Sequence, residues 1–168
     1  MTIHNQSHKV YLCLGSNEGV RMDYLQLARY FIQQKIGPIL SQSKIYESES
    51  WGVEGQPSFL NQVIALHTEM SPEILLEKTH EIEGQLGRKR NFHWASRTID
   101  IDILLYDNQV IQQEDLIIPH HLMNDRKFVL IPLCDIAAEE YHPVMKQSFS
   151  TLLKTCKDDK KVVAYHDE

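Results

Sequence analysis

Two aspartates, Asp100 and Asp102, stand two residues apart in the apolar segment SRTIDIDILLYD, residues 96–107. Isoleucines alternate with these acids, which predicts a β-strand whose side chains at i and i+2 share one face. Two carboxylates held that close repel each other unless a cation lies between them. Hard oxygen ligands favour Mg²⁺ or Mn²⁺ over zinc, so the pair is a candidate metal site. The same pattern also fits a strand with one solvated face.

A basic cluster lies directly upstream of the aspartates, formed by Arg88, Lys89, Arg90, His93 and Arg97. Arginine binds phosphate through two parallel hydrogen bonds. Such a cluster beside a metal-binding pair of acids favours a polyphosphate that is held from both sides. A solvated charged loop is one alternative, and nucleic acid is another, because basic patches bind it. The adjacent acids argue against nucleic acid, since they would repel a bare phosphate backbone, and the sequence lacks the aromatic motif of RNA-binding sheets.

The composition bounds the class of protein. The chain has 168 residues, a length that suits one domain over residues 1–168, with a core at about 9–155 and a charged C-terminal tail. Its net charge of -6 argues against binding to nucleic acid or to an anionic membrane. No apolar run reaches the ~20 residues of a membrane span, and the N-terminus lacks the apolar stretch of a signal peptide. Three cysteines without paired spacing are typical of reduced thiols. We therefore expect a cytoplasmic protein, monomeric or weakly dimeric, that binds neither nucleic acid nor membranes.

Apolar periodicity and turn residues predict the elements that position these side chains. We expect strands at 9–16, 39–48, 59–70 and 96–107, the last with a short partner at Val110-Ile111 after an Asp107-Asn108 turn. We expect helices at 21–36, from Ser71-Pro72 to Gly87, and near 128–137, where Pro132 interrupts or starts the helix. Loops are expected at 49–57 and 88–96, and a possible strand at 162–165 in a tail that otherwise frays.

The order strand, helix, strand, strand, helix, strand predicts a split βαβ arrangement. The expected fold class is α/β (α+β), a ferredoxin-like sandwich with a mainly antiparallel sheet and helices on both faces. This fold hosts many activities, so the side chains of the site must carry the functional argument.

Several motifs, in a fixed order along the chain, are similar to those of one enzyme family. The segment HWASRTIDIDIL at 93–104 resembles the signature of 6-hydroxymethyl-7,8-dihydropterin pyrophosphokinases, enzymes of folate biosynthesis. The resemblance extends over roughly residues 9–145, through LGSN at 14–17, QPSFLN at 56–61, IPH at 118–120 and NDRKFVLIPL at 124–133. It implies a ferredoxin-like α/β/α fold, ATP as co-substrate and two Mg²⁺ ions. It also implies transfer of the β,γ-diphosphate of ATP to the pterin hydroxymethyl group, with release of AMP.

The resemblance also implies roles for individual residues. Asp100 and Asp102 would bind both magnesium ions, and together with Arg88 and Arg97 they would form the catalytic set. The residues expected to contact ATP are Glu83, Arg88, Arg90, Trp94, Arg97, Ile103, His120 and Arg126. Two positions near the nucleotide differ from the family pattern: His80 replaces a common glutamine, and His121 replaces a common tyrosine.

A flat, polar pterin needs aromatic faces and hydrogen bonds along its edge. By the same resemblance, Phe59 and Phe128 would be the stacking rings, and Asn61 would bind the pterin edge. Backbone groups around Ser48 and Trp51 would supply further hydrogen bonds. Asn61 is the most informative of these residues, because an amide in an apolar strand needs polar partners.

Two other functions fit parts of the pattern. One is an ordinary kinase that transfers the γ-phosphoryl group to another small molecule, although the sequence lacks the GxxxxGK[ST] loop of P-loop kinases. The other is a noncatalytic ferredoxin-like module that binds nucleotides or RNA, against which the intact pair of aspartates argues.

Overall fold

The computed structural model describes residues 6–50, 55–87 and 98–166. Its largest sheet has the strand order β5-β1-β4-β3-β8, and β2 also pairs with β4. Every strand pairing in this sheet is antiparallel. The strands are β1 (His8–Ser16), β2 (Ile39–Gln42), β3 (Tyr46–Ser48), β4 (Phe59–Thr68), β5 (Asp100–Tyr106) and β8 (Val162–Ala164).

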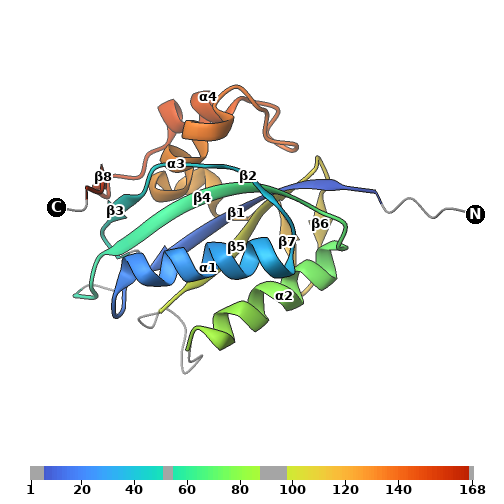
Figure 1. Ribbon diagram of the computed structural model, residues 1–168. Helices are drawn as coiled ribbons and strands as arrows, with labels where there is room; N and C mark the ends of the chain where they lie inside the picture. The colour runs from blue at the N-terminus through green and yellow to red at the C-terminus, as the bar shows by residue number, and fades with distance from the viewer. Residues whose placement is uncertain (1–5, 51–54, 88–97, 167–168) are drawn as a thin grey trace, which may run out of the picture.

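Helices cover both faces of this sheet, as Figure 1 shows. Helices α1 (Arg21–Lys35) and α2 (Pro72–Gln85) lie on one face, and α3 (Lys127–Ala137) and α4 (Phe149–Thr155) lie on the other. The predicted fold class, a mainly antiparallel α/β sandwich of ferredoxin type with helices on both faces, is confirmed. Among the described residues, no helix combines the length and the apolar character that a membrane crossing requires.

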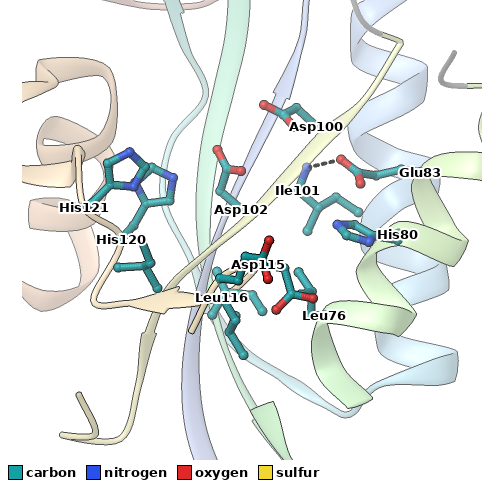
Figure 2. Close-up of a pocket in the computed structure, with 13 residues that line it drawn as sticks. Leu76, His80, Glu83, Asp100, Ile101, Asp102, Asp115, Leu116, His120 and His121 are labelled. Carbon is teal, nitrogen blue, oxygen red and sulfur yellow. Dashed lines mark hydrogen bonds between the residues drawn. The ribbon is translucent and has the colours of Figure 1, made fainter. Parts of the chain in front are cut away.

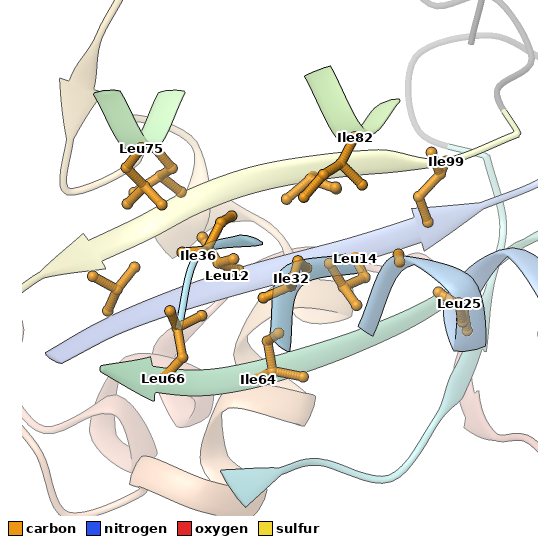
Figure 3. Packing of buried hydrophobic residues seen from close by; sticks show 14 of the residues in the cluster. Leu12, Leu14, Leu25, Ile32, Ile36, Ile64, Leu66, Leu75, Ile82 and Ile99 are labelled. Carbon is orange, nitrogen blue, oxygen red and sulfur yellow. The ribbon is translucent and has the colours of Figure 1, made fainter. Parts of the chain in front are cut away.

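Each face of the sheet buries its own hydrophobic cluster, because successive residues of a strand point to opposite faces. Leu12 and Leu14 of β1 pack toward α1 and α2 with Ile32 and Ile82 (Figure 3). The opposite cluster, under α3 and α4, contains Tyr11, Cys13, Val63, Ala65, Leu130, Leu133 and Phe149. The sheet that carries Asp100 and Asp102 is therefore packed against helices on both of its faces.

The predicted strand at 39–48 is wrong as a single element, because it is divided into β2 and β3. Both parts pair with β4, which is long enough to accommodate them one after the other. The first part ends at Gln42, and the following N–H, of Ser43, donates to Val63 O at 2.9 Å. The next N–H, of Lys44, leaves the sheet and donates to Asp135 Oδ2 of α3 at 3.1 Å. This break places Ser48 beside the start of β4.

Two further expectations need correction. Ile111 belongs to β6 (Ile111–Gln112), which pairs with β7 (Ile117–Ile118) in a separate small sheet, and not with the aspartate strand. Pro132 neither starts nor interrupts a helix: α3 begins at Lys127 and continues through it. A proline removes one helical hydrogen bond, and the helix nevertheless continues through Pro132, which is buried.

Two short helical elements in the C-terminal half were not predicted. One is a 3₁₀ turn (Met123–Asp125), which leads into α3. The other is α4, whose N-cap Ser148 accepts a hydrogen bond from the Thr151 N–H at 3.2 Å. The predicted turn after the aspartate strand is confirmed, since Asp107 has a φ of 49°. The possible strand at 162–165 is confirmed as β8.

Candidate active site

The aspartate pair lies on β5, an edge strand of the main sheet. Ile99, Ile101 and Ile103 are buried in the core below α1 and α2. Asp100 and Asp102 therefore lie on the other face, half-buried, and Figure 2 shows both carboxylates on one side of the strand. This confirms the predicted alternation along the segment. The position at an edge matters, because a ligand can approach the carboxylates without displacing a neighbouring strand.

A cleft of about 400 Å³ opens along this edge. Its second wall is α2, which contributes Leu76, His80 and Glu83, and its third wall is the segment 114–121. Figure 2 shows these side chains around the strand. The lining residues are Leu76, His80, Glu83, Asp100, Ile101, Asp102, Ile103, Glu114, Asp115, Leu116, Ile117, His120 and His121. Glu114 and Asp115 were not predicted, because nothing in the sequence signals that the β6–β7 turn folds back onto β5.

Glu83 joins α2 to the aspartate strand. Its side chain is buried, with 1% exposure, and its Oε2 accepts a hydrogen bond from the Ile101 N–H at 3.0 Å. An edge strand leaves outward backbone N–H groups without a strand partner, and a buried carboxylate is a strong acceptor for one of them. This bond fixes the strand between the two aspartates and holds it against the helix.

His120 faces the aspartates from the opposite wall (Figure 2). Its backbone N–H donates to Leu104 O at 3.0 Å, which fixes the residue to β5. Burial, and then the positive charge of Arg126, lower the pKa of His120 to about 4, so the ring is neutral at pH 7. The Leu122 N–H donates to Nδ1 at 3.2 Å. Because Nδ1 accepts this bond, the proton of the neutral ring lies on Nε2, which is a donor.

Arg126 and Phe128 lie together where α3 begins. The Arg126 guanidinium carbon is 5.5 Å from the centroid of the Phe128 ring, a cation–π contact. Arg126 is buried, whereas Phe128 is half-buried. Cys13 of β1 lies in the sheet below these two residues. Burial and the charges of Asp102 and Asp100 raise the pKa of its thiol, so Cys13 is a neutral core residue. The start of α3 thus presents one cation and one aromatic ring on the aspartate face of the sheet.

Asn61 lies on the same face, two strands away from Asp100. Gly15 of β1 pairs with Asp100 on one side and with Asn61 on the other. Asn61 is 2% exposed, and its Nδ2 donates to the Ser48 Oγ at 2.7 Å. Because cross-strand partners share a face, Asp100, Gly15 and Asn61 form one row, with Phe59 near its end.

Gly15 has no side chain, and this leaves space above the sheet for the side chains of Asn61 and Phe59. A Cβ atom at Gly15 would lie 3.3 Å from Asn61 Oδ1 and 3.5 Å from Phe59 Cδ1. Alanine at this position would already force the Asn61 amide to move by a few tenths of an ångström, while its contact with Phe59 would be an ordinary one. Gly15 was not predicted as a site residue, although a glycine inside an apolar strand signals close approach of another group.

The structure brings the described site residues into two adjoining groups. Asp100, Asp102, Glu83, Ile103 and His120 line the cleft, which we call the cleft group. The second group, the sheet-face group, consists of Ser48, Phe59, Asn61, Arg126 and Phe128. The other predicted site residues, Arg88, Arg90, Trp94, Arg97 and Trp51, lie outside the described residues.

The donor chemistry of the cleft fits magnesium. Among the described residues, no three or more His, Cys, Asp or Glu side chains are arranged to hold a metal ion. Mg²⁺ is commonly held by one or two carboxylates, and water and substrate phosphates complete its coordination. Asp100 and Asp102 meet that requirement.

Comparison with known proteins gives a consistent result. The family model for 7,8-dihydro-6-hydroxymethylpterin-pyrophosphokinase matches residues 11–138. The Aquifex aeolicus 2-amino-4-hydroxy-6-hydroxymethyldihydropteridine pyrophosphokinase is 41% identical over 138 residues, which cover 82% of this chain and 86% of the relative. The enzyme of that name from Haemophilus influenzae is 39% identical over 153 residues, 90% of this chain and 95% of the relative.

A solved structure supports the fold alone. The crystal structure of wild-type HPPK-DHPS from Plasmodium falciparum superimposes with a TM-score of 0.73 at 16% sequence identity. The match covers 91% of this chain and 45% of the other, so this chain spans less than half of that longer protein.

Proposed function

This chain belongs to the 7,8-dihydro-6-hydroxymethylpterin-pyrophosphokinase family, and we propose that it transfers the diphosphate group of ATP to 6-hydroxymethyl-7,8-dihydropterin. The products are AMP and the pterin diphosphate, an intermediate of folate biosynthesis. The observation that carries the proposal is the row of Asp100, Gly15 and Asn61 across the sheet. It sets a candidate metal ligand beside a buried amide that suits the edge of a heterocycle.

In this proposal the cleft group holds MgATP. Two magnesium ions bound to Asp100 and Asp102 would offset the charge that develops on the phosphate oxygens during transfer. Ile103 lines the cleft on an edge strand, whose outward backbone groups suit hydrogen bonds to the adenine. Glu83 holds that strand in place through the Ile101 N–H. Arg88, Arg90, Arg97 and Trp94 remain predicted ATP contacts.

His120 is proposed as a neutral hydrogen-bond donor to a phosphate oxygen. Its Nδ1 is occupied by the Leu122 N–H, so Nε2 carries the donor hydrogen. Arg126, buried at the start of α3, supplies the fixed positive charge on the same side. A cation and a neutral donor placed in advance stabilise transferring phosphate without reorganisation during the reaction.

The sheet-face group, apart from Arg126, is proposed to bind the pterin. Phe128 and Phe59 offer aromatic faces, and Asn61 Oδ1 can accept hydrogen bonds from the edge of the heterocycle while its Nδ2 is held by Ser48. Trp51 stays a predicted contact. Side chains that are already oriented lose little freedom on binding, so the hydroxymethyl group would be held close to the phosphates bound at Asp100.

A product assay tests the proposal. The protein is incubated with ATP, Mg²⁺ and the hydroxymethyl-dihydropterin, and adenine nucleotides are separated by chromatography. We expect AMP in equal amount to the pterin diphosphate, and none without the pterin. ADP as the nucleotide product would instead identify a γ-phosphoryl kinase, and the absence of any product would favour a binding module. The expected cytoplasmic location, the monomeric or weakly dimeric state and the absence of nucleic-acid binding stay predictions.

A further inference from the structure

The chain continues beyond the region matched by the family model, which ends at residue 138. Residues 157–165, here called the C-terminal strap, return to the sheet on the side where β3 lies (Figure 1). The sequence predicted a charged tail that frays except for a possible strand. The strap is instead anchored at two points, and both anchors contact elements that carry residues of the sheet-face group.

The first anchor is Asp158, which caps α3 from outside the helix. The first N–H groups of a helix lack partners within it, and the N-cap residue Arg126 makes no side-chain cap bond. The Lys127 N–H donates to Asp158 Oδ2 at 3.0 Å. The other oxygen of Asp158, Oδ1, accepts the Lys160 N–H at 3.0 Å. One carboxylate therefore ties the strap to the first turn of α3, and its negative charge suits the positive end of the helix.

The second anchor is β8, which extends the sheet beyond β3. In the antiparallel pairing of β8 with β3, Val162 lies opposite Ser48. The Tyr165 N–H donates to Ile45 O at 2.8 Å. Between the anchors, Lys160 Nζ lies 3.8 Å from Glu49 Oε2. The strap thus joins the start of α3 to the strand that carries Ser48.

We propose that Asp158 is a positioning residue for pterin binding. It acts by fixing the first turn of α3, which carries Arg126 and Phe128, relative to β3. Ser48 on β3 orients the Asn61 amide, so the strap sets the spacing between the stacking ring and the hydrogen-bonding edge. Asp158 itself touches neither substrate. This inference rests on the proposed function.

The test compares Asp158→Ala with a matched control, Asp159→Ala, in the full-length protein. Asp159 is the next residue along the chain and is exposed, so the two variants lose one negative charge each, at adjacent positions. Amide hydrogen exchange measures the stability of the first turn of α3, and titration with the hydroxymethyl-dihydropterin at a saturating, non-hydrolysable ATP analogue and Mg²⁺ measures pterin affinity.

We expect Asp158→Ala to speed exchange at residues 127–129 and to weaken pterin binding, each by about fivefold, the effect of losing one helix cap. Asp159→Ala should match the unsubstituted protein. Asp158→Asn keeps one acceptor oxygen and should fall between them, and it decides the question if Asp158→Ala does not fold.

Two results would overturn the positioning role. One is equal exchange in Asp158→Ala and Asp159→Ala, and the other is faster exchange in Asp158→Ala with unchanged pterin affinity. Failure of the unsubstituted protein to bind the pterin would overturn the proposed function together with the positioning role. The two failures are therefore distinguishable.

Discussion

The cleft group and the sheet-face group adjoin each other, but they are built from different kinds of side chain. The carboxylates of Asp100 and Asp102 are half-exposed on one face of an edge strand, where a bound cation would offset the repulsion between them. Asn61 is buried, and its amide already donates to Ser48. The first group therefore depends on charge that arrives with the nucleotide, whereas the second is oriented before its ligand binds.

This contrast suggests a division of labour within the site. Substitutions in the cleft group should mainly lower turnover, because this group is the one proposed to stabilise transition-state charge. Substitutions in the sheet-face group other than at Arg126 should mainly weaken pterin binding and leave the affinity for nucleotide unchanged. The following experiments test that division, from the largest expected effect to the smallest.

Loss of either aspartate should have the largest effect. Asp100→Asn or Asp102→Asn keeps the shape of the side chain but removes one of the two charges proposed to hold the metal. We expect turnover at saturating Mg²⁺ to fall about 10³-fold, since metal binding supplies several kcal/mol of charge stabilisation. The apoprotein should be as stable as before or slightly more stable, because the repulsion is gone.

Steady-state rates and thermal unfolding without metal measure both effects. Glu81→Gln, at an exposed position of α2, is the matched control for a lost carboxylate. Turnover close to that of the control in both aspartate variants would contradict the two-metal site. It would also contradict the expectation that substitutions in the cleft group mainly lower turnover.

Asn61→Ala should act on the other half of the comparison. It removes the amide proposed to bind the pterin edge and leaves Ser48 Oγ without its 2.7 Å partner. The lost hydrogen bonds correspond to about 1–2 kcal/mol, or roughly tenfold weaker pterin binding. Calorimetric titrations with the pterin and with a non-hydrolysable ATP analogue separate the two ligands. A similar loss of affinity for both would indicate general damage to the sheet.

Gly15→Ala should have a smaller effect of the same kind. The added methyl group would lie 3.3 Å from Asn61 Oδ1, so the amide must move by a few tenths of an ångström. We expect pterin binding to weaken severalfold, by about 1 kcal/mol, while nucleotide binding is unchanged. Gly84→Ala is the matched control, because no atom of the described residues, apart from its own stretch of helix, lies within 4 Å of the added Cβ and alanine favours a helix. Equal pterin affinity in both variants would show that Gly15 does not shape the site.

The sequence predicted the cleft group better than its surroundings. The alternation of Asp100 and Asp102 with isoleucines fixes their common face, because side-chain direction along a strand has a period of two. The family motifs supplied His120 and Asn61, and the structure places both near this face. Local patterns of this kind need no knowledge of distant contacts.

Residues that the sequence could not assign depend on contacts between distant segments. Asp158 caps a helix that begins 31 residues earlier in the chain, and no local pattern in the tail indicates that bond. The division of 39–48 into two strands likewise depends on Asp135, which draws the Lys44 N–H out of the sheet. Gly15 is intermediate, since its type was a signal but its neighbours Asn61 and Phe59 come from another strand.

The last prediction concerns stability, and it involves His120 and the balance of charge in the cleft. Burial and the charge of Arg126 lower the pKa of this ring to about 4, whereas an unfolded histidine has a pKa near ~6.5. As the pH falls below that of the unfolded histidine, the unfolded state binds a proton that the folded state does not. Stability is therefore lost between about pH 6.5 and pH 4, and it is fully present above that window.

His120→Gln keeps a polar side chain but has no proton to bind in this range. The metal-free protein should lose about 1–2 kcal/mol of unfolding free energy between pH 7 and pH 5 on account of His120, and the variant should lose that much less. Urea unfolding at both pH values, with a chelator present, measures the difference, and His166→Gln, at an exposed position, is the control. Parallel pH profiles for the protein and for His120→Gln would mean that the ring titrates like an exposed histidine. It would then carry positive charge toward the phosphates at mildly acidic pH, and the cleft would contain a second cation beside Arg126 where we infer a neutral donor.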